Sequence, residues 1–261
     1  MTRAAASVVR EPRVLVLAHR GDSRAAPENT LPAFASAVRL DVDLVELDYV
    51  HSADGVPIVF HDDTLDRVTD ARSVFGERDV PVASKNLAAL RRLDAGNWFG
   101  ATFASTRIPT LEEALRLIGP ATLTMIERKA GDPATLVNLL KSLEMVDRVV
   151  VTAFDWQFLT ECHKLEPRLV LGALGTKTLT ATQLEQAISV GAGVIGWDDG
   201  FVTEEHVERV HGRGLRAWVW TVDDPHRAQQ LIAYGVDGLI SNLPAQVQAV
   251  VRRVKGDVES G

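Results

Sequence analysis

The chain has little cysteine and no long apolar run. Cys162 is its single cysteine, which excludes an intramolecular disulfide, and its place near Leu159 in a helical pattern predicts a packing role. No stretch approaches the roughly 20 apolar residues of a membrane span. The run at residues 14–18 is too short for the core of a signal peptide. We therefore expect a soluble, cytoplasmic protein with no stable membrane association.

Positive charge is also scarce. Lys and Arg number 28 against 35 Asp and Glu, which gives a formal net charge of −7 at pH 7. This balance offers no electrostatic footprint for nucleic acid or for an anionic membrane surface, so we expect no nucleic-acid partner. A substrate that carries phosphate must then be attracted by a local basic group or by a metal ion. The sequence leaves the oligomeric state open.

Linkers rich in Ser, Gly and Pro are missing as well, so the 261 residues can form one domain with a single large core. Short β-rich runs alternate with helical patterns. The expected strands are 14–18, 44–50, 122–128, 149–154, 169–174, 193–198, 215–221 and 237–241, and the expected helices lie near 31–40, 110–118, 133–144, 156–164, 180–190, 203–213, 224–234 and 244–253, with Thr30, Thr110 and Thr203 as N-caps. Eight strands, each followed by a helix, predict an α/β fold, a (β/α)8 TIM barrel, as a single domain over residues 1–261.

One hairpin and one long segment fall outside this alternation. Asp54-Gly55 is a strong signal for a two-residue turn between strand 44–50 and a short strand at 56–60. The segment from about 63 to 107 carries several aromatic residues without regular periodicity, and a connection this long is usually functional. We expect an insertion over about 51–107 after the second strand. It forms either a cap over the barrel mouth or a satellite cluster that covers one barrel edge.

The hairpin brings charged groups together. With the turn centred on Asp54-Gly55, paired residue numbers sum to 109, so His61 would lie opposite Asp48. Side chains alternate along a strand, so Glu46 and Asp48 share one face and His61 returns to it. A Glu-x-Asp pair is more often a solvated face than a metal site, but these neighbours are apolar. Uncompensated burial of a charge costs roughly 3–5 kcal/mol, so we expect a cation beside the pair.

Active sites of such barrels lie at the C-terminal ends of the strands. The first strand ends in His19 and Arg20, and the third ends in Glu127 and Lys129. The planar fork of Arg20 suits the oxygens of a phosphate, which we prefer here to a surface salt bridge. With the Glu-x-Asp pair of the second strand, Glu127 provides a third carboxylate. Three oxygen ligands suit one divalent metal ion, Mg²⁺ or Ca²⁺, better than zinc.

The motifs, taken in order, are similar to those of one known family. The succession HRG, PENT, ELD, HDDTLDRVT, LDAGNWF, IPTLEEAL, IERK and WVWTVDD resembles the glycerophosphodiester phosphodiesterases from the first strand to the last. The resemblance implies a barrel of the phosphatidylinositol-phospholipase-C-like type. It also implies a site with His19 and His61 as the acid/base pair, Glu46, Asp48 and Glu127 as metal ligands, and Arg20, Lys129, Trp220, Glu28 and Asn29 as substrate-binding residues.

The chain departs from the family pattern at a few positions. Arg128 replaces a usual Ile at a position that faces outward, and His51 stands where Thr is common. Asn242 stands where Asp is usual, which removes a carboxylate near the barrel mouth, and Asp223 stands where Asn is typical. None of these changes touches the expected chemical core, but together they affect substrate preference.

The resemblance implies metal-dependent hydrolysis of glycerophosphodiesters, small-molecule substrates, to glycerol 3-phosphate and an alcohol. One histidine would act as base and the other as acid, and the sequence does not say which. No Ser or Cys lies in a motif suited to covalent catalysis, so water or the substrate's own hydroxyl must attack. Two alternatives stay open: a lysophospholipase D-type or cyclising phosphodiesterase acting on lipid substrates, and a phosphodiester-binding module without turnover. Turnover of glycerophosphocholine against lysophosphatidylcholine separates them.

Overall fold

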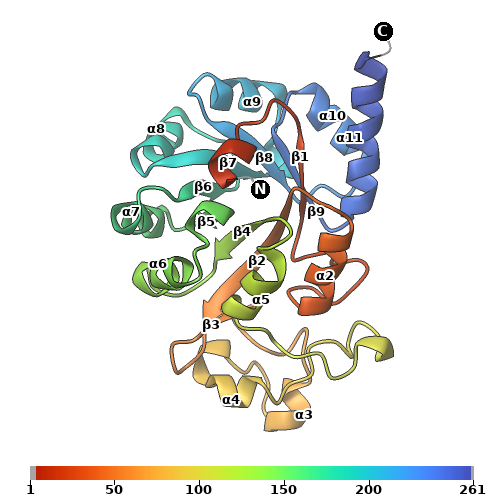
Figure 1. The fold of residues 1–261 in the computed structure, drawn as a ribbon, viewed down its shortest axis with the longest axis vertical. Helices are drawn as coiled ribbons and strands as arrows, with labels where there is room; N and C mark the ends of the chain where they lie inside the picture. Colours follow the sequence, from red (N-terminus) through yellow and green to blue (C-terminus); the bar gives the residue numbers. More distant parts are fainter. Residues whose placement is uncertain (1–3, 260–261) are drawn as a thin grey trace.

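Eight parallel strands form a closed barrel in the computed structural model, which describes residues 4–259 (Figure 1). They are β1 (Leu15–Ala18), β2 (Leu44–His51), β4 (Leu123–Arg128), β5 (Val149–Ala153), β6 (Val170–Gly175), β7 (Ala192–Asp198), β8 (Arg216–Trp220) and β9 (Gly238–Ser241). Neighbours in this order pair with one another, and β1 pairs with both β9 and β2, which closes the sheet. The predicted barrel is confirmed, and each predicted strand has its counterpart.

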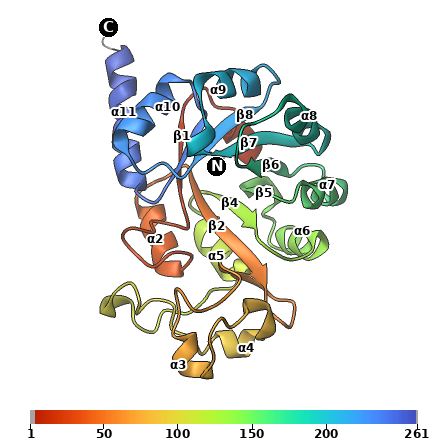
Figure 2. The same cartoon turned by 180° about the vertical axis from the view of Figure 1, so that it is seen from behind.

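A helix follows each barrel strand. These helices are α2 (Leu31–Arg39), α5 (Leu111–Ile118), α6 (Pro133–Ser142), α7 (Trp156–Leu165), α8 (Ala181–Ser189), α9 (Glu204–His211), α10 (Pro225–Ala233) and α11 (Pro244–Glu259), and they surround the barrel (Figure 2). Thr110 and Thr203 cap α5 and α9 as predicted. Thr30 occupies the N-cap position of α2 as predicted, but its side chain makes no capping hydrogen bond, because its hydroxyl donates instead to the carbonyl of Pro27 at 2.5 Å. No helix in residues 4–259 has both the length and the apolar character needed to cross a bilayer.

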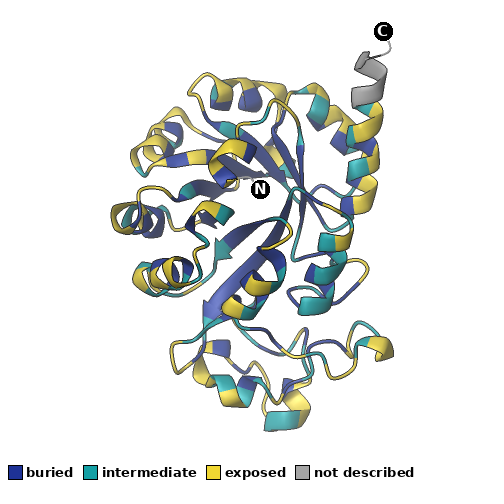
Figure 3. Ribbon diagram, in the orientation of Figure 1, coloured by how far each residue is buried: buried dark blue, intermediate teal, exposed yellow. Residues whose placement is uncertain are grey.

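Two apolar layers pack against the barrel wall, one on its outside and one on its inside. The outer layer fills the space between strands and helices, and Figure 3 shows most of the strand residues buried. The inner layer fills the N-terminal half of the barrel, where Leu17, Leu44 and Trp218 pack with residues of the short helix α1 (Ala5–Val8). This helix lies outside the predicted elements, since a single turn carries no helical periodicity. Because the inner layer is apolar, the polar interior side chains are confined to the opposite end of the barrel.

The insertion after β2 forms a lobe beside the barrel (Figures 1 and 2). It contains β3 (Pro57–Val59), α3 (Ala71–Phe75), α4 (Leu87–Leu90) and the short 3-10 turns Val82–Ser84 and Ala101–Phe103. We call residues 51–107 the lobe. Its apolar residues, with Ile58, Leu65, Leu90 and Leu93 at the centre, form a third cluster separate from the two barrel layers.

The hairpin between β2 and β3 differs from its predicted register by one residue. Tyr49 pairs with Val59, so paired residue numbers sum to 108 rather than 109. Phe60, and not His61, therefore lies across from Asp48, and the Phe60 amide donates to the Asp48 carbonyl at 3.1 Å. β3 ends at Val59, so His61 lies beyond the ladder and its position is set by the loop that follows.

The turn itself explains this shift. Gly55 has φ +79, in the left-handed region, and its amide donates to the Ser52 carbonyl at 2.9 Å. The Ser52 amide in turn donates to the Val56 carbonyl at 3.0 Å. This is a three-residue loop closed by a bulge at glycine, rather than a two-residue turn centred on Asp54-Gly55. The extra loop residue moves every later residue of β3 by one position.

Candidate active site

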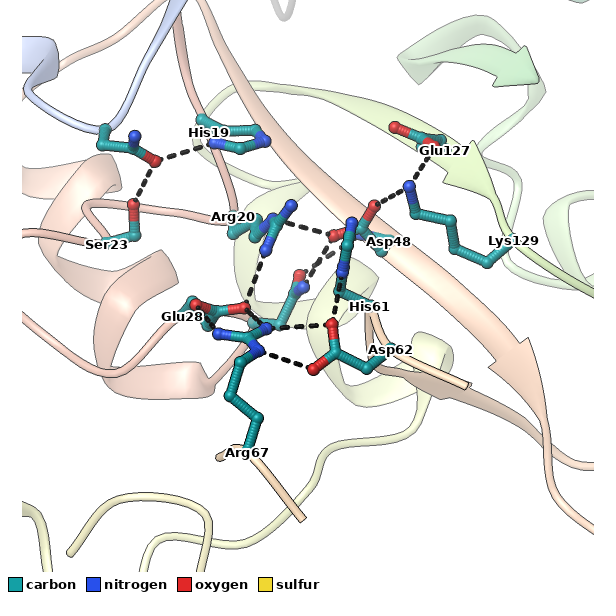
Figure 4. A network of polar contacts seen from close by, with 12 residues as sticks. His19, Arg20, Ser23, Glu28, Asp48, His61, Asp62, Arg67, Glu127 and Lys129 are labelled. Carbon is teal, nitrogen blue, oxygen red and sulfur yellow. Dashed lines mark hydrogen bonds and ion pairs between the residues drawn. The ribbon is translucent and has the colours of Figure 1, made fainter. Parts of the chain in front are cut away.

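A cavity of about 200 Å³ opens at the C-terminal ends of the barrel strands. Its polar walls are His19 and Arg20 after β1, Glu46 on β2, His61 in the lobe, and Glu127 and Lys129 at the end of β4. Its apolar walls come from Met125, Phe154, Leu174, Trp220 and Ile240. The two histidines, which are 42 positions apart in the chain, thus line one cavity (Figure 4).

Three carboxylates meet at one side of this cavity. Glu46 and Asp48 point inward from β2, and Glu127 of β4 is the direct register partner of Asp48. One oxygen from each lies within 4.8 Å of the other two. Burial raises the pKa of Glu46 well above its ordinary value, and the neighbouring Asp48 raises it further. Burial, followed by Asp48, raises the pKa of Glu127 to about 7. The cluster is therefore short of positive charge.

The oxygens of this cluster fit a hard divalent cation. Glu46 Oε1 is buried and accepts no hydrogen bond from the residues that the structure describes. Asp48 Oδ1 and Glu127 Oε1 are also buried without a hydrogen bond there, and each forms an ion pair with the Lys129 ammonium, at 3.4 Å for Asp48. Mg²⁺ and Ca²⁺ prefer all-oxygen donor sets of this kind. Glu46, Asp48 and Glu127 are thus the residues able to hold such an ion.

Arg20 links the cavity to its supporting network. Its φ of +56 is unusual for a residue with a side chain and turns its amide toward Glu46 Oε2, at 2.6 Å. Its guanidinium donates to Glu28 at 2.8 Å and lies 3.3 Å from Asp48 Oδ2. Burial works to lower the pKa of Arg20, but Asp48 and Glu28 outweigh it and raise that pKa. Arg20 therefore brings a permanent cation to the cavity wall.

Glu28 and Asn29 lie behind the cavity rather than in its wall. Asn29 donates to Asp48 Oδ2 at 2.8 Å and accepts from the Asp48 backbone amide at 3.2 Å, so it holds Asp48 by both its side chain and its backbone. Glu28 lies between Arg20 and Arg67, with two hydrogen bonds from Arg67 at 2.9 and 2.6 Å. The direct contacts of both residues are thus with the side chains of the site.

Each histidine uses Nδ1 for a hydrogen bond with a side-chain oxygen. His61 Nδ1 lies 2.6 Å from Asp62 Oδ1, and Arg67 holds the second oxygen of Asp62 at 2.6 Å. His19 Nδ1 lies 2.7 Å from Asn242 Oδ1. Burial, followed by the charge of Arg20, lowers the pKa of His19 to about 4. The two imidazoles therefore have different partners, a carboxylate for one and an amide for the other.

Sequence reasoning did not identify these partners as site residues. Asp62 and Arg67 stand in the HDDTLDRVT motif, directly after His61 and six positions beyond it, and this proximity was the available signal. From the sequence, Asn242 indicates only that a carboxylate usual in the family pattern is missing. The structure shows that the carboxylate of Asp223 lies beside it, accepting from Asn242 Nδ2 at 2.8 Å. A carboxylate is therefore retained near the barrel mouth, one side chain further from His19.

Aromatic side chains form the open edge of the cavity. Phe154, which follows β5, is 47% exposed and meets Trp220 edge-on, with ring centroids 5.8 Å apart. The Lys129 ammonium lies 5.9 Å from the Phe154 ring centroid. Trp220 Nε1 is buried without a hydrogen-bond partner among the described residues. The pair provides an apolar surface beside the charged half of the cavity.

Two predictions about residues outside the cavity are confirmed. Arg128 faces outward, where it donates to Asp155 at 3.0 Å and covers the Phe158 ring at 5.0 Å. Cys162 is buried, and burial raises the pKa of its thiol to about 12, which keeps it protonated and unreactive. Neither residue takes part in the polar network of the site.

Known proteins resemble this chain in sequence and in fold. The sequence model of the Glycerophosphoryl diester phosphodiesterase family matches residues 19–246. A glycerophosphodiester phosphodiesterase of Caldanaerobacter subterraneus is 34% identical over 248 residues, 92% of this chain and 99% of that protein. One of Bacillus subtilis is 30% identical, over 89% of this chain and 84% of that protein. A solved phosphodiesterase of Oleispira antarctica, in complex with the product sn-glycerol-3-phosphate, superposes with a TM-score of 0.83 at 27% identity, covering 91% of this chain and 96% of that one.

Proposed function

Because the chain belongs to the glycerophosphoryl diester phosphodiesterase family, we propose that it hydrolyses small glycerophosphodiesters to glycerol 3-phosphate and an alcohol. One observation carries this proposal: two histidines, two cationic side chains and a carboxylate cluster meet at one cavity. The product bound to the Oleispira relative supports the choice of product. The cavity, at about 200 Å³, is below the roughly 300–1,000 Å³ typical of drug-sized ligands, which favours a small substrate.

A divalent ion, Mg²⁺ or Ca²⁺, is the cofactor in this proposal. Glu46, Asp48 and Glu127 would hold it, which is supported by the proximity of their oxygens and by the buried Glu46 Oε1, which has no hydrogen-bond partner among the described residues. When bound, such an ion supplies positive charge to phosphoryl oxygens. Arg20 and Lys129 bind the same phosphate from the cavity wall and stabilise the negative charge that develops on it in the transition state.

The two histidines divide the proton transfers according to their surroundings. His19 is buried beside Arg20, which favours the neutral imidazole, so we assign it as the base that accepts the proton of the attacking hydroxyl. His61 pairs through Nδ1 with the carboxylate of Asp62, an anionic partner that His19 lacks, so we assign it as the acid that protonates the leaving alkoxide. Since His61 comes from the lobe, barrel and lobe act as a single domain in this proposal.

The attacking group is the glycerol hydroxyl next to the phosphate. Among the described residues that line the cavity there is no serine or cysteine to act as a covalent nucleophile. Attack by the adjacent hydroxyl forms a five-membered cyclic phosphate and expels the alcohol, and water then opens the ring. Effective molarities of well-placed groups reach about 10⁵–10⁸ M. A substrate with this hydroxyl replaced by hydrogen should therefore react orders of magnitude more slowly, and equal kcat values would indicate direct attack by water.

A lysophospholipase D-type activity is the second candidate. The observation in its favour is the exposed Phe154 beside Trp220, a surface on which an acyl chain could lie. Glycerophosphocholine and lysophosphatidylcholine carry the same headgroup and differ in the acyl chain. A higher kcat/KM for lysophosphatidylcholine, lost on Phe154→Ala, would assign the protein to lipid substrates.

The main experiment is a substrate panel with metal-stripped protein. Release of glycerol 3-phosphate from glycerophosphocholine, -ethanolamine and -glycerol is measured after addition of Mg²⁺, Ca²⁺, Mn²⁺ or Zn²⁺. His19→Ala and His61→Ala should each lower kcat by at least about 10², because each group moves a proton. His226→Ala is the matched control, since His226 is exposed and outside the cavity. Turnover in excess chelator, or near-normal kcat in either histidine variant, would reject the corresponding part of the proposal.

A further inference from the structure

His19 is held by β9 through both its backbone and its side chain. Its amide donates to the Ser241 carbonyl at 2.9 Å, and its Nδ1 lies 2.7 Å from Oδ1 of Asn242, the next residue. A side-chain amide is an ambiguous partner for an imidazole, because it can present either its carbonyl or its NH₂ group. The orientation of Asn242 therefore decides which nitrogen of a neutral His19 carries the proton.

Asp223 removes this ambiguity. Its Oδ2 accepts from Asn242 Nδ2 at 2.8 Å, while its Oδ1 accepts from the Asn242 amide at 2.8 Å and from the Ser241 hydroxyl at 2.9 Å. A carboxylate only accepts hydrogen bonds, so the NH₂ group of Asn242 must face Asp223. Its Oδ1 then faces His19, where the Ser23 hydroxyl also donates to it at 3.0 Å.

We propose that Asn242 and Asp223 are positioning residues that fix the tautomer of His19, with the proton on Nδ1 and the lone pair on Nε2 facing the cavity. Asn242 Oδ1 can only accept a hydrogen bond, so His19 Nδ1 must donate one. Nε2 is then the nitrogen that is left to take a proton. This inference rests on the proposed function in assigning His19 as the base. In a serine protease, the wrong tautomer beside an amide lowers kcat by about 10⁴.

The pair Asp223 and Asn242 also keeps negative charge from direct contact with the His19 imidazole. Asp223 acts through Asn242, so an amide and not a carboxylate touches His19. His61, in contrast, touches the carboxylate of Asp62 directly. The same tautomer is thus obtained on both rings, but only His61 has an anionic partner.

The tautomer can be read by ¹⁵N NMR of the full chain, labelled at histidine, in Mg²⁺-containing buffer at neutral pH. The His19→Gln variant assigns the His19 signals. We expect Nδ1 of His19 to be of the protonated, pyrrole type and Nε2 of the unprotonated, pyridine type. A proton on Nε2 in the unmodified protein would overturn the proposal.

Asp223→Asn should reverse the tautomer. The carbonyl of the new amide would stay with the Asn242 backbone amide, which leaves its NH₂ group facing the Asn242 side chain and turns the NH₂ of Asn242 toward His19. We expect the proton to move to Nε2, and kcat to fall by at least about tenfold with KM within about twofold, since proton transfer contributes about 10²–10⁴ to rate. An unchanged tautomer in this variant would show that Asp223 does not fix the tautomer of His19.

The double variant Asp223→Asn/Asn242→Asp is the rescue. It exchanges the two side chains, so a carboxylate oxygen replaces the amide oxygen as the acceptor for His19 Nδ1, and the tautomer should return. Asn242→Ala gives a route that leaves Asp223 intact: it removes the acceptor and should abolish the Nδ1 preference. Asp224→Asn is the matched control, because Asp224 is exposed and only caps α10. If the unmodified protein turns over no glycerophosphodiester, the proposed function fails, while the spectra still decide this inference.

Discussion

Glu127→Gln should reduce the loss of stability that the metal-free protein undergoes as the pH rises from 5 to 8. Burial raises the pKa of Glu127 from 4.5 to about 7 in the folded chain. A folded-state pKa above the unfolded value means that the group contributes stability below pH 4.5 and that this contribution is lost as pH rises through 7. At about 1.4 kcal/mol per pKa unit, the loss is of the order of 3 kcal/mol. Glutamine does not ionise, so the variant should lack this loss.

The assay is urea unfolding in excess chelator at pH 5 and pH 8. The difference in unfolding free energy between the two pH values should be about 2–3 kcal/mol smaller in Glu127→Gln than in the unmodified protein. Glu112→Gln is the control, because Glu112 is exposed on α5 and its ion pair with Arg116 is of the surface type, worth about 0–1 kcal/mol.

Metal addition completes the test. An ion that binds only the folded protein adds about 2.7 kcal/mol at 100 times its Kd. The unmodified protein at pH 8 should therefore recover stability on addition of Mg²⁺ or Ca²⁺. Glu127→Gln should gain less, because one anionic ligand is lost. Equal pH dependence and equal metal-induced gains in the two proteins would refute the reasoning.

Three further predictions concern packing, acid stability and the lobe. Gly175→Ala should destabilise by about 1–3 kcal/mol in urea unfolding, because a Cβ there would overlap the Trp197 ring, whereas Ala at the open Gly193 should be neutral. Burial lowers the pKa of His206 to about 4, so the contribution of the neutral imidazole to stability is present above pH 6.5 and is lost as the pH falls through 4. His206→Gln should remove this loss of stability at acid pH, which is at most about 3 kcal/mol. Arg67→Ala should lower kcat by about tenfold or more, because it frees Glu28 and Asp62, while Arg72→Ala, in the same lobe, should not.

The barrel was predictable because its signals are periodic and repeated. Eight apolar runs, each followed by an amphipathic pattern, leave few topologies to consider. The hairpin register was not predictable in this way. Asp54-Gly55 is compatible with a two-residue turn and with a three-residue loop that places Gly55 at a left-handed position, and these differ by one residue in register. A shift of one residue reverses the faces, but residues 57–60 are all apolar, so the alternation of side chains does not choose between the two registers.

The site was predictable only in part, for a similar reason. That Asp48 and Glu127 lie side by side on adjacent strands and face inward follows from barrel geometry. The partners of the histidines do not follow from it. Asn242 is 223 positions from His19, and the direction of its amide depends on a hydrogen bond that it donates to Asp223 and that no local pattern encodes. Sequence reasoning identifies which side chains reach a strand end, but not which atom of each is turned toward its neighbour.

The position of His61 links catalysis to the cooperativity of unfolding. The lobe has an apolar cluster of its own, separate from both barrel layers, and such units can open below the free energy of global unfolding. His61 comes from the lobe, whereas His19 and the carboxylates come from the barrel. Local opening of the lobe would therefore separate the two histidines while the barrel stays folded. Under mild denaturant, loss of turnover should precede loss of barrel structure, which makes enzymatic activity a sensitive reporter of a subglobal opening.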